Sequence, residues 1–369
     1  MLEYLHIKNF KTLADAGFPL AHLNVFSGLN GMGKSSVIQA LLLLRQSYER
    51  HTLIQQGLML NDDYAELGLG KDIFHADSQD DTISFVLRWQ SRPSADHFVF
   101  TYQADTNLLP IETYNLSGDL SELSLFCDGF SYLSAERLGP RHHHRLSSHH
   151  VKNLNTLGIQ GEYTVHYIAV HGVKPLSIPG LQHTNAINHS LSANLEAWMA
   201  ELSPGLNIRA TVHTEFNTAV LEYAFIQGND RTDFFKPQNV GFGLSYILPV
   251  VTQVLSAKPG DLLIIENPES HLHPAGQSLL GKLCSLAAAN GVQLIIESHS
   301  DHFLNGIRVA VKQDMILSDQ VSVFFLQRAM ETNQHASEVL SPEIDQTGRI
   351  DHWPAGFFDE WDHQLEQLL

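Results

Sequence analysis

Cysteine is scarce in this chain. Its 369 residues include only Cys127 and Cys284, and the two do not form a C-x-x-C pair. A disulfide scaffold and a zinc site built from cysteines both need several cysteines at close spacing. The sequence therefore argues against both as the basis of the fold.

Long apolar runs are also missing. The longest, such as residues 40–44, are far shorter than the ~20 residues that a membrane helix needs. The opening MLEYLHIKNFKTL has no apolar core of the kind found in signal peptides. We therefore expect a cytoplasmic protein without a membrane-spanning segment.

Positive charge is in short supply. The chain has 22 Lys and Arg against 40 Asp and Glu, which gives a net charge of −18. A compact nucleic-acid-binding module usually has the opposite sign. Contact with DNA would need a local patch, and the candidate strip is Arg137, Arg141, Arg145 and Lys152.

What the chain does contain is ample apolar material, 43% of its residues, which suffices for a folded core. Apolar patterns and turn residues predict a mixed α/β organisation. The predicted strands are 2–7, 23–27, 83–89, 97–102, 130–133, 207–215, 219–226, 261–266, 292–300 and 321–328. The predicted helices are 36–48, 190–201 with Ser190 or Ser192 as N-cap, and one that starts near Gly243.

This pattern suggests four segments. They are an N-terminal lobe (1–140), an insertion (141–235), a C-terminal lobe (236–330) and an aromatic tail (331–369). The strands 261–266 and 292–300 are apolar throughout, so we expect them to be buried and parallel.

A phosphate-binding loop is the most specific motif. Residues 28–35, GLNGMGKS, fit G-x-x-x-x-G-K-[ST] between a predicted strand and a predicted helix. Glycines let backbone N–H groups approach phosphates, and the helix N-terminus adds partial positive charge. Lys34 is expected to reach the β- and γ-phosphates, and Ser35 to ligate Mg²⁺. The predicted nucleotide-binding residues here are Gly28, Asn30, Gly31, Gly33, Lys34, Ser35 and Ser36.

The stretch DLLIIENPESHLHP supplies candidate catalytic carboxylates. A buried strand that ends in an acid is the Walker B arrangement, which predicts Glu266 as the acid on the metal side. The usual next residue is a catalytic glutamate, but here it is Asn267, whose amide can orient water but cannot accept its proton. Glu269 is the nearest replacement base. Slow hydrolysis with Asn267 and normal turnover with Glu269 both remain open, as does a merely structural pair of acids at a helix start.

Two further motifs point to phosphate. His299 directly follows the buried strand VQLIIE, where an imidazole can contact a terminal phosphate and the attacking water. The segment VGFGLSY places Gly241, Gly243 and Ser245 at a helix start, which is a second anion-binding arrangement. Because one chain needs one phosphate loop, we interpret this second site as facing the nucleotide of another protomer.

In chain order, GLNGMGKSS, GFGLS, LLIIENPESHLHP and IIESHSDHFL resemble the motifs of ABC-type ATPase heads of the SMC, RecF and OLD-nuclease lineage. IKNFKTL resembles the I-x-N-F-[KR] opening of those heads. The segment 348–359 resembles the W-P-x-G-F-F-D ending, a domain of unknown function, of short stand-alone bacterial AAA-type ATPases.

The resemblance implies a P-loop NTPase of ABC-head type. Its core sheet would be mixed or parallel, with an antiparallel accessory sheet and a helical insertion. Lys34 and Ser35 become the phosphate-loop ligands, Glu266 the Walker B acid and His299 the switch histidine. Gly241, Gly243 and Ser245 become a signature loop that acts in trans, and Asn267 departs from the usual catalytic base. Arg137 is either a phosphate or lobe contact or a surface arginine paired with Glu136.

The function expected from these motifs is hydrolysis of ATP to ADP and phosphate, with ATP and Mg²⁺ bound between two copies of the chain. Such a homodimer would act as a switch for a separate effector protein, for example in phage defence, because no effector domain is evident. A RecF-like DNA-binding ATPase and a scaffold that scarcely hydrolyses ATP are the alternatives.

Two other clusters allow two interpretations each. The polar segment HHHRLSSHH is expected to be an exposed loop, or a metal site formed by its histidines. The tail either caps the core or docks an effector through its large aromatic residues. The residues concerned are His142, His143, His144, His149 and His150 in the first cluster, and Trp353, Phe357, Phe358 and Trp361 in the tail.

Overall fold

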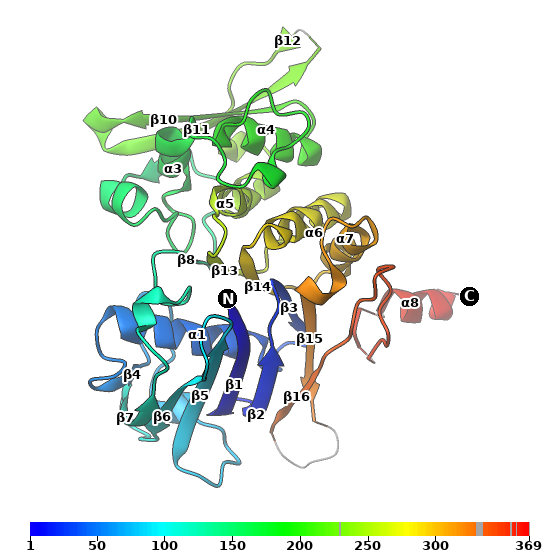
Figure 1. The fold of residues 1–369 in the computed structure, drawn as a ribbon. Coiled ribbons are helices and arrows are strands. Elements are labelled where there is room, and N and C mark those ends of the chain that lie inside the picture. Colours follow the sequence, from blue (N-terminus) through cyan, green and yellow to red (C-terminus); the bar gives the residue numbers. More distant parts are fainter. Residues whose placement is uncertain (229, 330–334, 355, 359, 369) are drawn as a thin grey trace. The chain divides into compact units, whose positions relative to one another are not determined.

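The computed structural model describes residues 1–228, 230–329, 335–354, 356–358 and 360–368. These residues form two compact units (Figure 1). The first unit comprises Met1–Phe130, Asp319–Asp345 and Arg349–Leu369, so it contains both ends of the chain. The second unit comprises Ser131–Ser318 and Gln346–Gly348.

The first unit contains an antiparallel sheet whose strands follow the order β2-β1-β5-β6-β7-β4. Along β1, buried side chains alternate with more exposed ones, which fits a sheet with one face on the core. The strands are β1 (Leu2–Phe10), β2 (Leu13–Pro19), β4 (Gly57–Met59), β5 (Thr82–Trp89), β6 (Asp96–Thr101) and β7 (Leu108–Asn115). This is the accessory sheet that the sequence predicts.

The first unit also contains a three-stranded array, β3 (Leu23–Gly28), β15 (Val321–Arg328) and β16 (Ser337–Leu340). β15 runs parallel to β3 and antiparallel to β16. The helix α1 (Lys34–Glu49) follows β3 after a short loop and is buried over most of its length. Shorter helices are α2 (Gly70–Ile73), a 3-10 turn at Leu120–Glu122 and the C-terminal α8 (Glu360–Leu368).

The second unit is built around two parallel strands, β13 (Leu262–Glu266) and β14 (Gln293–Glu297), and β13 also neighbours β8 (Phe130–Leu133). β14 is buried at every position, which explains its continuous apolar run. Both strands end at a glutamate, and Glu266 is in register with Glu297. Strand formation stops at Glu297, three residues before the predicted end at Ser300.

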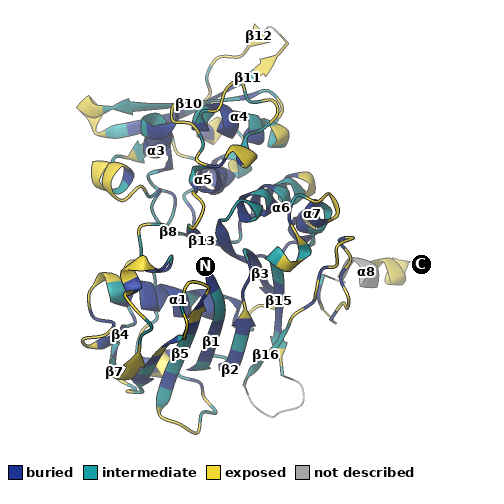
Figure 2. Ribbon diagram, viewed as in Figure 1, coloured by how far each residue is buried: buried dark blue, intermediate teal, exposed yellow. Residues whose placement is uncertain are grey.

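Five helices accompany these strands, and neighbouring members of the set α3–α7 pack on one another. They are α3 (Thr164–His171), α4 (Leu191–Leu202), α5 (Phe242–Ser256), α6 (Pro274–Ala289) and α7 (Asp301–Lys312). Ser190 is the N-cap of α4 and accepts a hydrogen bond from the Ala193 N–H, which decides between the two predicted caps. Figure 2 shows α5 mostly buried, and its buried stretch runs from Ser245 to Leu255.

The second unit carries its own antiparallel sheet, in which β11 pairs with β10, β12 and β9. The strands are β9 (His143–Arg145), β10 (Leu206–His213), β11 (Thr218–Gln227) and β12 (Asp230–Arg231). Short helical turns occupy His149–Asn153, Pro179–Leu181, Thr214–Phe216 and Pro237–Asn239, and another, Ser318–Gln320, spans the end of this unit and the return to the first.

The sequence predicts either an exposed loop or a metal site for the histidine-rich segment 142–150. The structure shows that part of this segment is a strand. It contributes β9, and His144 is held close to β11, where burial lowers the pKa of its imidazole. The described part of the chain contains no group of three or more histidine, cysteine or acidic side chains suited to hold a metal, so this cluster forms none.

The tail is divided between the two interpretations. Phe357 is fully buried, and its ring lies 5.2 Å from that of Phe325 on β15, so it caps the core of the first unit. Trp353 is 47% exposed. The side chain of Trp361 lies outside the described residues. Among the helices that the structure describes, none has the length and apolar character needed to cross a bilayer.

Candidate functional site

In the first unit, the loop between β3 and α1 owes its shape to three glycines. Gly28, Gly31 and Gly33 have φ angles of 134°, 78° and 88°, in a region that other residues rarely adopt. A Cβ atom on Gly28 would lie 2.1 Å from the Leu326 carbonyl oxygen, and one on Gly33 would lie 2.6 Å from Thr12 Oγ1. Two of these positions are thus closed to larger residues by space as well as by backbone conformation.

Lys34 is buried inside this loop, with 3% of the residue exposed. Its Nζ donates hydrogen bonds to the carbonyl oxygens of Gly28 (2.9 Å) and Leu29 (2.8 Å). α1 begins here without a side-chain cap and without an acid in its first turn. The loop therefore combines an ammonium group with the positive end of a sixteen-residue helix, which is suited to bind phosphate.

Ser35 and Ser36 lie in the first turn of α1, where Ser35 is half-buried and Ser36 is buried. Asn30 and Gly31 lie at the exposed tip of the loop. The structure thus places all of the phosphate-loop residues predicted from the sequence on one loop and helix start.

In the second unit, two glutamates lie side by side at the ends of β13 and β14. Because Glu266 and Glu297 are in register on adjacent parallel strands, their side chains project from the same face of the sheet. Glu266 Oε2 accepts a hydrogen bond from the Ala135 N–H (3.0 Å). Burial raises the pKa of Glu266, while hydrogen bonds from Ala135 and the Tyr132 hydroxyl oppose that rise. Sequence reasoning missed Glu297, although this residue ends its apolar strand in the same way as Glu266 does.

The backbone conformation at residue 267 explains why this residue is asparagine. Its φ angle is 43°, in the left-handed region that asparagine adopts more readily than glutamate does. Its N–H donates to the Glu297 carbonyl oxygen (2.8 Å). Its Oδ1 atom is buried and has no hydrogen-bond partner among the described residues, so it is available to accept one from a ligand or water.

Glu269 lies one turn further on and is 7% exposed. Its Oε1 accepts a hydrogen bond from the His299 N–H (2.8 Å), whereas its buried Oε2 has no partner in the described part of the chain. Burial raises the pKa of Glu269, and the bond from His299 is the largest of the opposing effects. Glu269 therefore fixes the loop after β14 through its Oε1 atom, and its Oε2 atom can accept a hydrogen bond from a ligand or water.

The His299 side chain remains 42% exposed, and its Nε2 lies 3.9 Å from Glu297 Oε1. Ser300, which follows His299, is the N-cap of α7, and its Oγ accepts a hydrogen bond from the Phe303 N–H (2.9 Å). The imidazole thus projects from a fixed loop beside a carboxylate that can orient it.

Arg137 is neither a surface residue nor a partner of Glu136. It is 6% exposed, and its guanidinium donates to the backbone carbonyls of Ser134 (2.8 Å), Glu266 (2.7 Å) and Asn267 (2.6 Å). It also lies 4.3 Å from the centre of the Tyr246 ring. Arg137 therefore clamps the end of β13 from inside. The proposed basic strip loses this member and keeps the exposed Arg141, Arg145 and Lys152.

The start of α5 presents glycine rather than serine to the surface. Gly241 is the exposed N-cap, and a Cβ on Gly243 would lie 2.5 Å from the His271 carbonyl oxygen. The Ser245 hydroxyl is buried beside that of Tyr223, because residue 245 lies one turn into the helix. The Ser245 hydroxyl, which the sequence assigns to a signature loop acting in trans, therefore does not lie at the exposed start of α5.

Aromatic contacts connect this helix start to the acidic cluster. The His271 ring lies 4.6 Å from the Phe242 ring and 4.9 Å from the Tyr246 ring. The hydroxyl of Tyr246 donates to the Ala135 carbonyl, while the Ala135 N–H donates to Glu266. The second unit therefore brings Glu266, Asn267, Glu269, His299 and the start of α5 into one connected network.

Three family models match segments of the chain. Residues 1–110 match "AAA ATPase domain", residues 161–305 match "AAA domain, putative AbiEii toxin, Type IV TA system", and residues 316–368 match "Protein of unknown function (DUF3696)". The last match includes residues 348–359, the segment for which the sequence predicts a domain of unknown function. No curated protein matches the chain.

Among solved structures, an SMC head bound to the C-terminal winged-helix domain of ScpA has a TM-score of 0.54 and 14% identity, over 93% of this chain and 98% of that one. The SMC head of Thermotoga maritima has a TM-score of 0.48 and 11% identity, over 93% and 99% of the two chains. A head from Pyrococcus furiosus, bound to the C-terminal domain of ScpA, has a TM-score of 0.48 and 12% identity, over 100% and 99%. At 14% identity, the first of these matches shows that the chain shares the fold of an SMC head.

Proposed function

We propose that this chain, an ABC-type ATPase head of the SMC, RecF and OLD lineage, hydrolyses ATP in the cytoplasm and dimerises around it. The observation that carries the proposal is the glycine loop that holds the buried Lys34 at the start of α1. A loop of this shape supplies inward N–H groups, an ammonium and a helix dipole, which together match a triphosphate. The match of residues 1–110 to an AAA ATPase domain supports the same conclusion.

Each unit offers one candidate ligand for the Mg²⁺ that such chemistry uses. Hard cations prefer oxygen ligands, and the Ser35 hydroxyl and the Glu266 carboxylate offer them. Glu266 is held by Ala135 and Tyr132, so its orientation is fixed before any ligand binds. When bound, Mg²⁺ neutralises charge on the phosphate oxygens.

We assign the attacking water to Asn267, Glu269 and His299. The free Oδ1 of Asn267 orients it, and the free Oε2 of Glu269 accepts its proton. A carboxylate whose pKa is raised by burial is a stronger proton acceptor than an exposed one. His299, directed by Glu297, contacts the terminal phosphate.

Glu269→Gln tests this assignment. Glutamine keeps an oxygen that can accept the His299 N–H, so the loop stays in place while the base is lost. We expect turnover to fall about 100-fold or more, with little change in ATP affinity. Unchanged turnover would refute the assignment of Glu269. Glu297→Gln is the matched variant for the neighbouring carboxylate. Negligible turnover in the native chain itself would favour the alternative of a nucleotide-binding scaffold that scarcely hydrolyses ATP.

Dimerisation and a separate effector complete the proposal. The exposed Gly241 at the start of α5 offers an anion-binding helix end that the chain's own phosphate loop does not need. The match to an AbiEii-type AAA domain is compatible with a role in phage defence, and a related SMC head binds a partner protein. Light scattering with and without ATP and Mg²⁺, with Lys34→Ala as control, tests the dimer. A mass that stays monomeric with ATP would refute it.

A further inference from the structure

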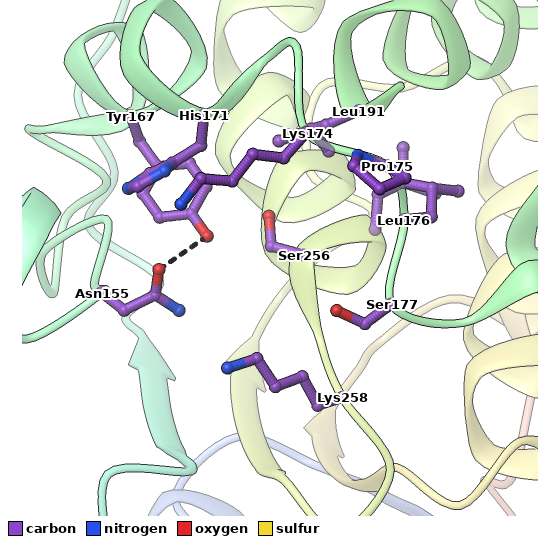
Figure 3. A pocket seen from close by; sticks show the side chains of 11 residues that line it. Asn155, Tyr167, His171, Lys174, Pro175, Leu176, Ser177, Leu191, Ser256 and Lys258 are labelled. Carbon is purple, nitrogen blue, oxygen red and sulfur yellow. Dashed lines mark hydrogen bonds between the residues drawn. The ribbon is translucent and has the colours of Figure 1, made fainter. Parts of the chain in front are cut away.

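The second unit contains a cavity of about 110 Å³ whose position lies apart from the motifs described above (Figure 3). It is formed by the end of α3, the segment that leads to α4, and the end of α5. Its lining residues are Asn155, Tyr167, His171, Lys174, Pro175, Leu176, Ser177, Leu191, Leu255, Ser256 and Lys258.

The lining is basic in a chain that is strongly acidic. It includes Lys174 and Lys258 but no aspartate or glutamate, although the chain carries a net charge of −18. In the described part of the chain, neither ammonium lies within 4.0 Å of a carboxylate. The acid nearest in sequence, Asp261, accepts a hydrogen bond from the backbone N–H of Lys258. The two ammonium groups therefore face this space from its rim without a carboxylate in direct contact, and Asp261 acts on Lys258 only through a longer-range Coulomb interaction.

Polar groups complete the lining. The Tyr167 hydroxyl donates to Asn155 Oδ1 (3.1 Å), and this bond leaves the Asn155 amide nitrogen directed toward the cavity (Figure 3). The Ser177 hydroxyl reaches the same space from the opposite wall. Ammonium, amide and hydroxyl groups are all hydrogen-bond donors, so the cavity offers donors on several sides.

The wall behind these donors is preorganised. His171 is 7% exposed, its Nε2 lies 3.0 Å from the Val151 carbonyl oxygen, and its ring lies 4.6 Å from the Tyr167 ring. Because α3 and α5 carry this wall, little conformational entropy needs to be lost when a ligand binds.

We propose that this cavity binds a small oxyanion of the phosphate class, either free phosphate or the phosphate group of a small ester. One water needs ~10–15 Å³ of such space, so 110 Å³ holds a cluster of waters or one such anion. Ligand pockets for whole nucleotides and drug-sized molecules usually exceed ~300 Å³. The cavity therefore fits a phosphate group and not a complete nucleotide.

This site is distinct from the proposed ATP site. Lys258 precedes β13 and Glu266 ends it, and a five-residue strand spans ~16 Å. Ser256 ends α5 and Gly241 caps its start, and a helix of fifteen residues spans ~22 Å. The cavity thus lies at the opposite end of both elements from the residues assigned to ATP.

The test uses the full-length chain with Lys34→Ala, which weakens phosphate binding at the glycine loop, and titrates it with inorganic phosphate and with glycerol phosphate by calorimetry. We expect saturable binding with a Kd below about 1 mM for at least one of them. Their relative affinity identifies the free or the esterified source. Adding Lys174→Ala and Lys258→Ala together should weaken binding at least 10-fold, and adding Lys282→Ala, a lysine on α6, should not.

Asn155→Asp provides a second test that does not depend on the folding of the double lysine variant. It keeps the shape and the acceptor for Tyr167 but places a negative charge in the cavity, so it should also weaken phosphate at least 10-fold. Equal affinity in the double lysine variant, or no saturable heat up to about 10 mM phosphate, would overturn the proposal. Malonate bound as tightly as phosphate would overturn the assignment to the phosphate class.

Discussion

Arg137→Met removes a buried cation that holds the end of β13. The guanidinium donates to three carbonyl oxygens, those of Ser134, Glu266 and Asn267, and stacks on Tyr246. Methionine fills a similar volume but donates no hydrogen bond. The substitution therefore isolates the loss of the polar contacts from the opening of a cavity.

The magnitude follows from the number of bonds. Each hydrogen bond from a charged donor contributes ~1.5–3 kcal/mol, so three bonds set an upper range of ~4.5–9 kcal/mol. Relaxation of the carbonyls and the lower desolvation cost of methionine reduce this. We expect a loss of ~3–5 kcal/mol in the free energy of unfolding, typical of breaking a buried charge cluster.

Urea unfolding followed by circular dichroism measures this change. With a slope of ~3 kcal/mol per molar urea, the midpoint should fall by ~1–1.7 M. Arg141→Met is the matched control, because Arg141 is exposed, and its midpoint should move by no more than ~0.2 M. A midpoint for Arg137→Met as close as that to the native value would refute the interpretation of Arg137 as a clamp.

Three further predictions concern the proposed ATP site. A Cβ on Gly241 meets nothing within 4 Å, so Gly241→Glu should leave the fold intact but abolish ATP-dependent dimerisation in light scattering, whereas Gly241→Ala should dimerise normally. Burial raises the pKa of Glu269 above its ordinary value of 4.5, so the native state binds protons more tightly than the unfolded state, and this carboxyl lowers stability as pH rises above 4.5. The stability of Glu269→Gln relative to the native chain should therefore improve from pH 4.5 to pH 7 in urea titrations, and an unchanged difference would contradict this reasoning. Lys34→Ala should abolish most of the rise in Tm that ATP with Mg²⁺ gives the native chain, which at 100 times Kd corresponds to ~2.7 kcal/mol, and an equal rise in both would refute the role of Lys34.

The sequence was sufficient for features that depend on local patterns. Continuous apolar runs identified β13 and β14, and a motif of fixed spacing identified the glycine loop before α1. The ABC-head fold followed because four such motifs occur in one order. Ser190 illustrates the same point, since an N-cap is determined by residues within one turn.

Features that depend on distant pairing could not be obtained in this way. β9 forms because His143–Arg145 pair with β11, some seventy residues further on, and nothing in its histidines signals a strand. Two interpretations of Arg137, a phosphate or lobe contact and a surface arginine, stayed open because its partners are backbone carbonyls, which carry no side-chain signal. Glu297 was overlooked because its significance lies in its register with Glu266. Ser245 was taken from a motif, but its orientation depends on where α5 begins.

The charges of the acidic network have a consequence for its ligand. Glu266, Glu269 and Glu297 are largely buried around the ends of β13 and β14, and Arg137 is the buried cation that acts on Glu266 and Glu269. If all three carboxylates ionise, one guanidinium leaves the cluster with an excess of negative charge in a medium that screens poorly. Such a cluster repels a bare triphosphate and attracts a divalent cation. We therefore expect the chain to bind ATP as its Mg²⁺ complex, and we expect Glu266→Gln to lower the dependence of affinity on Mg²⁺ more than Lys34→Ala does.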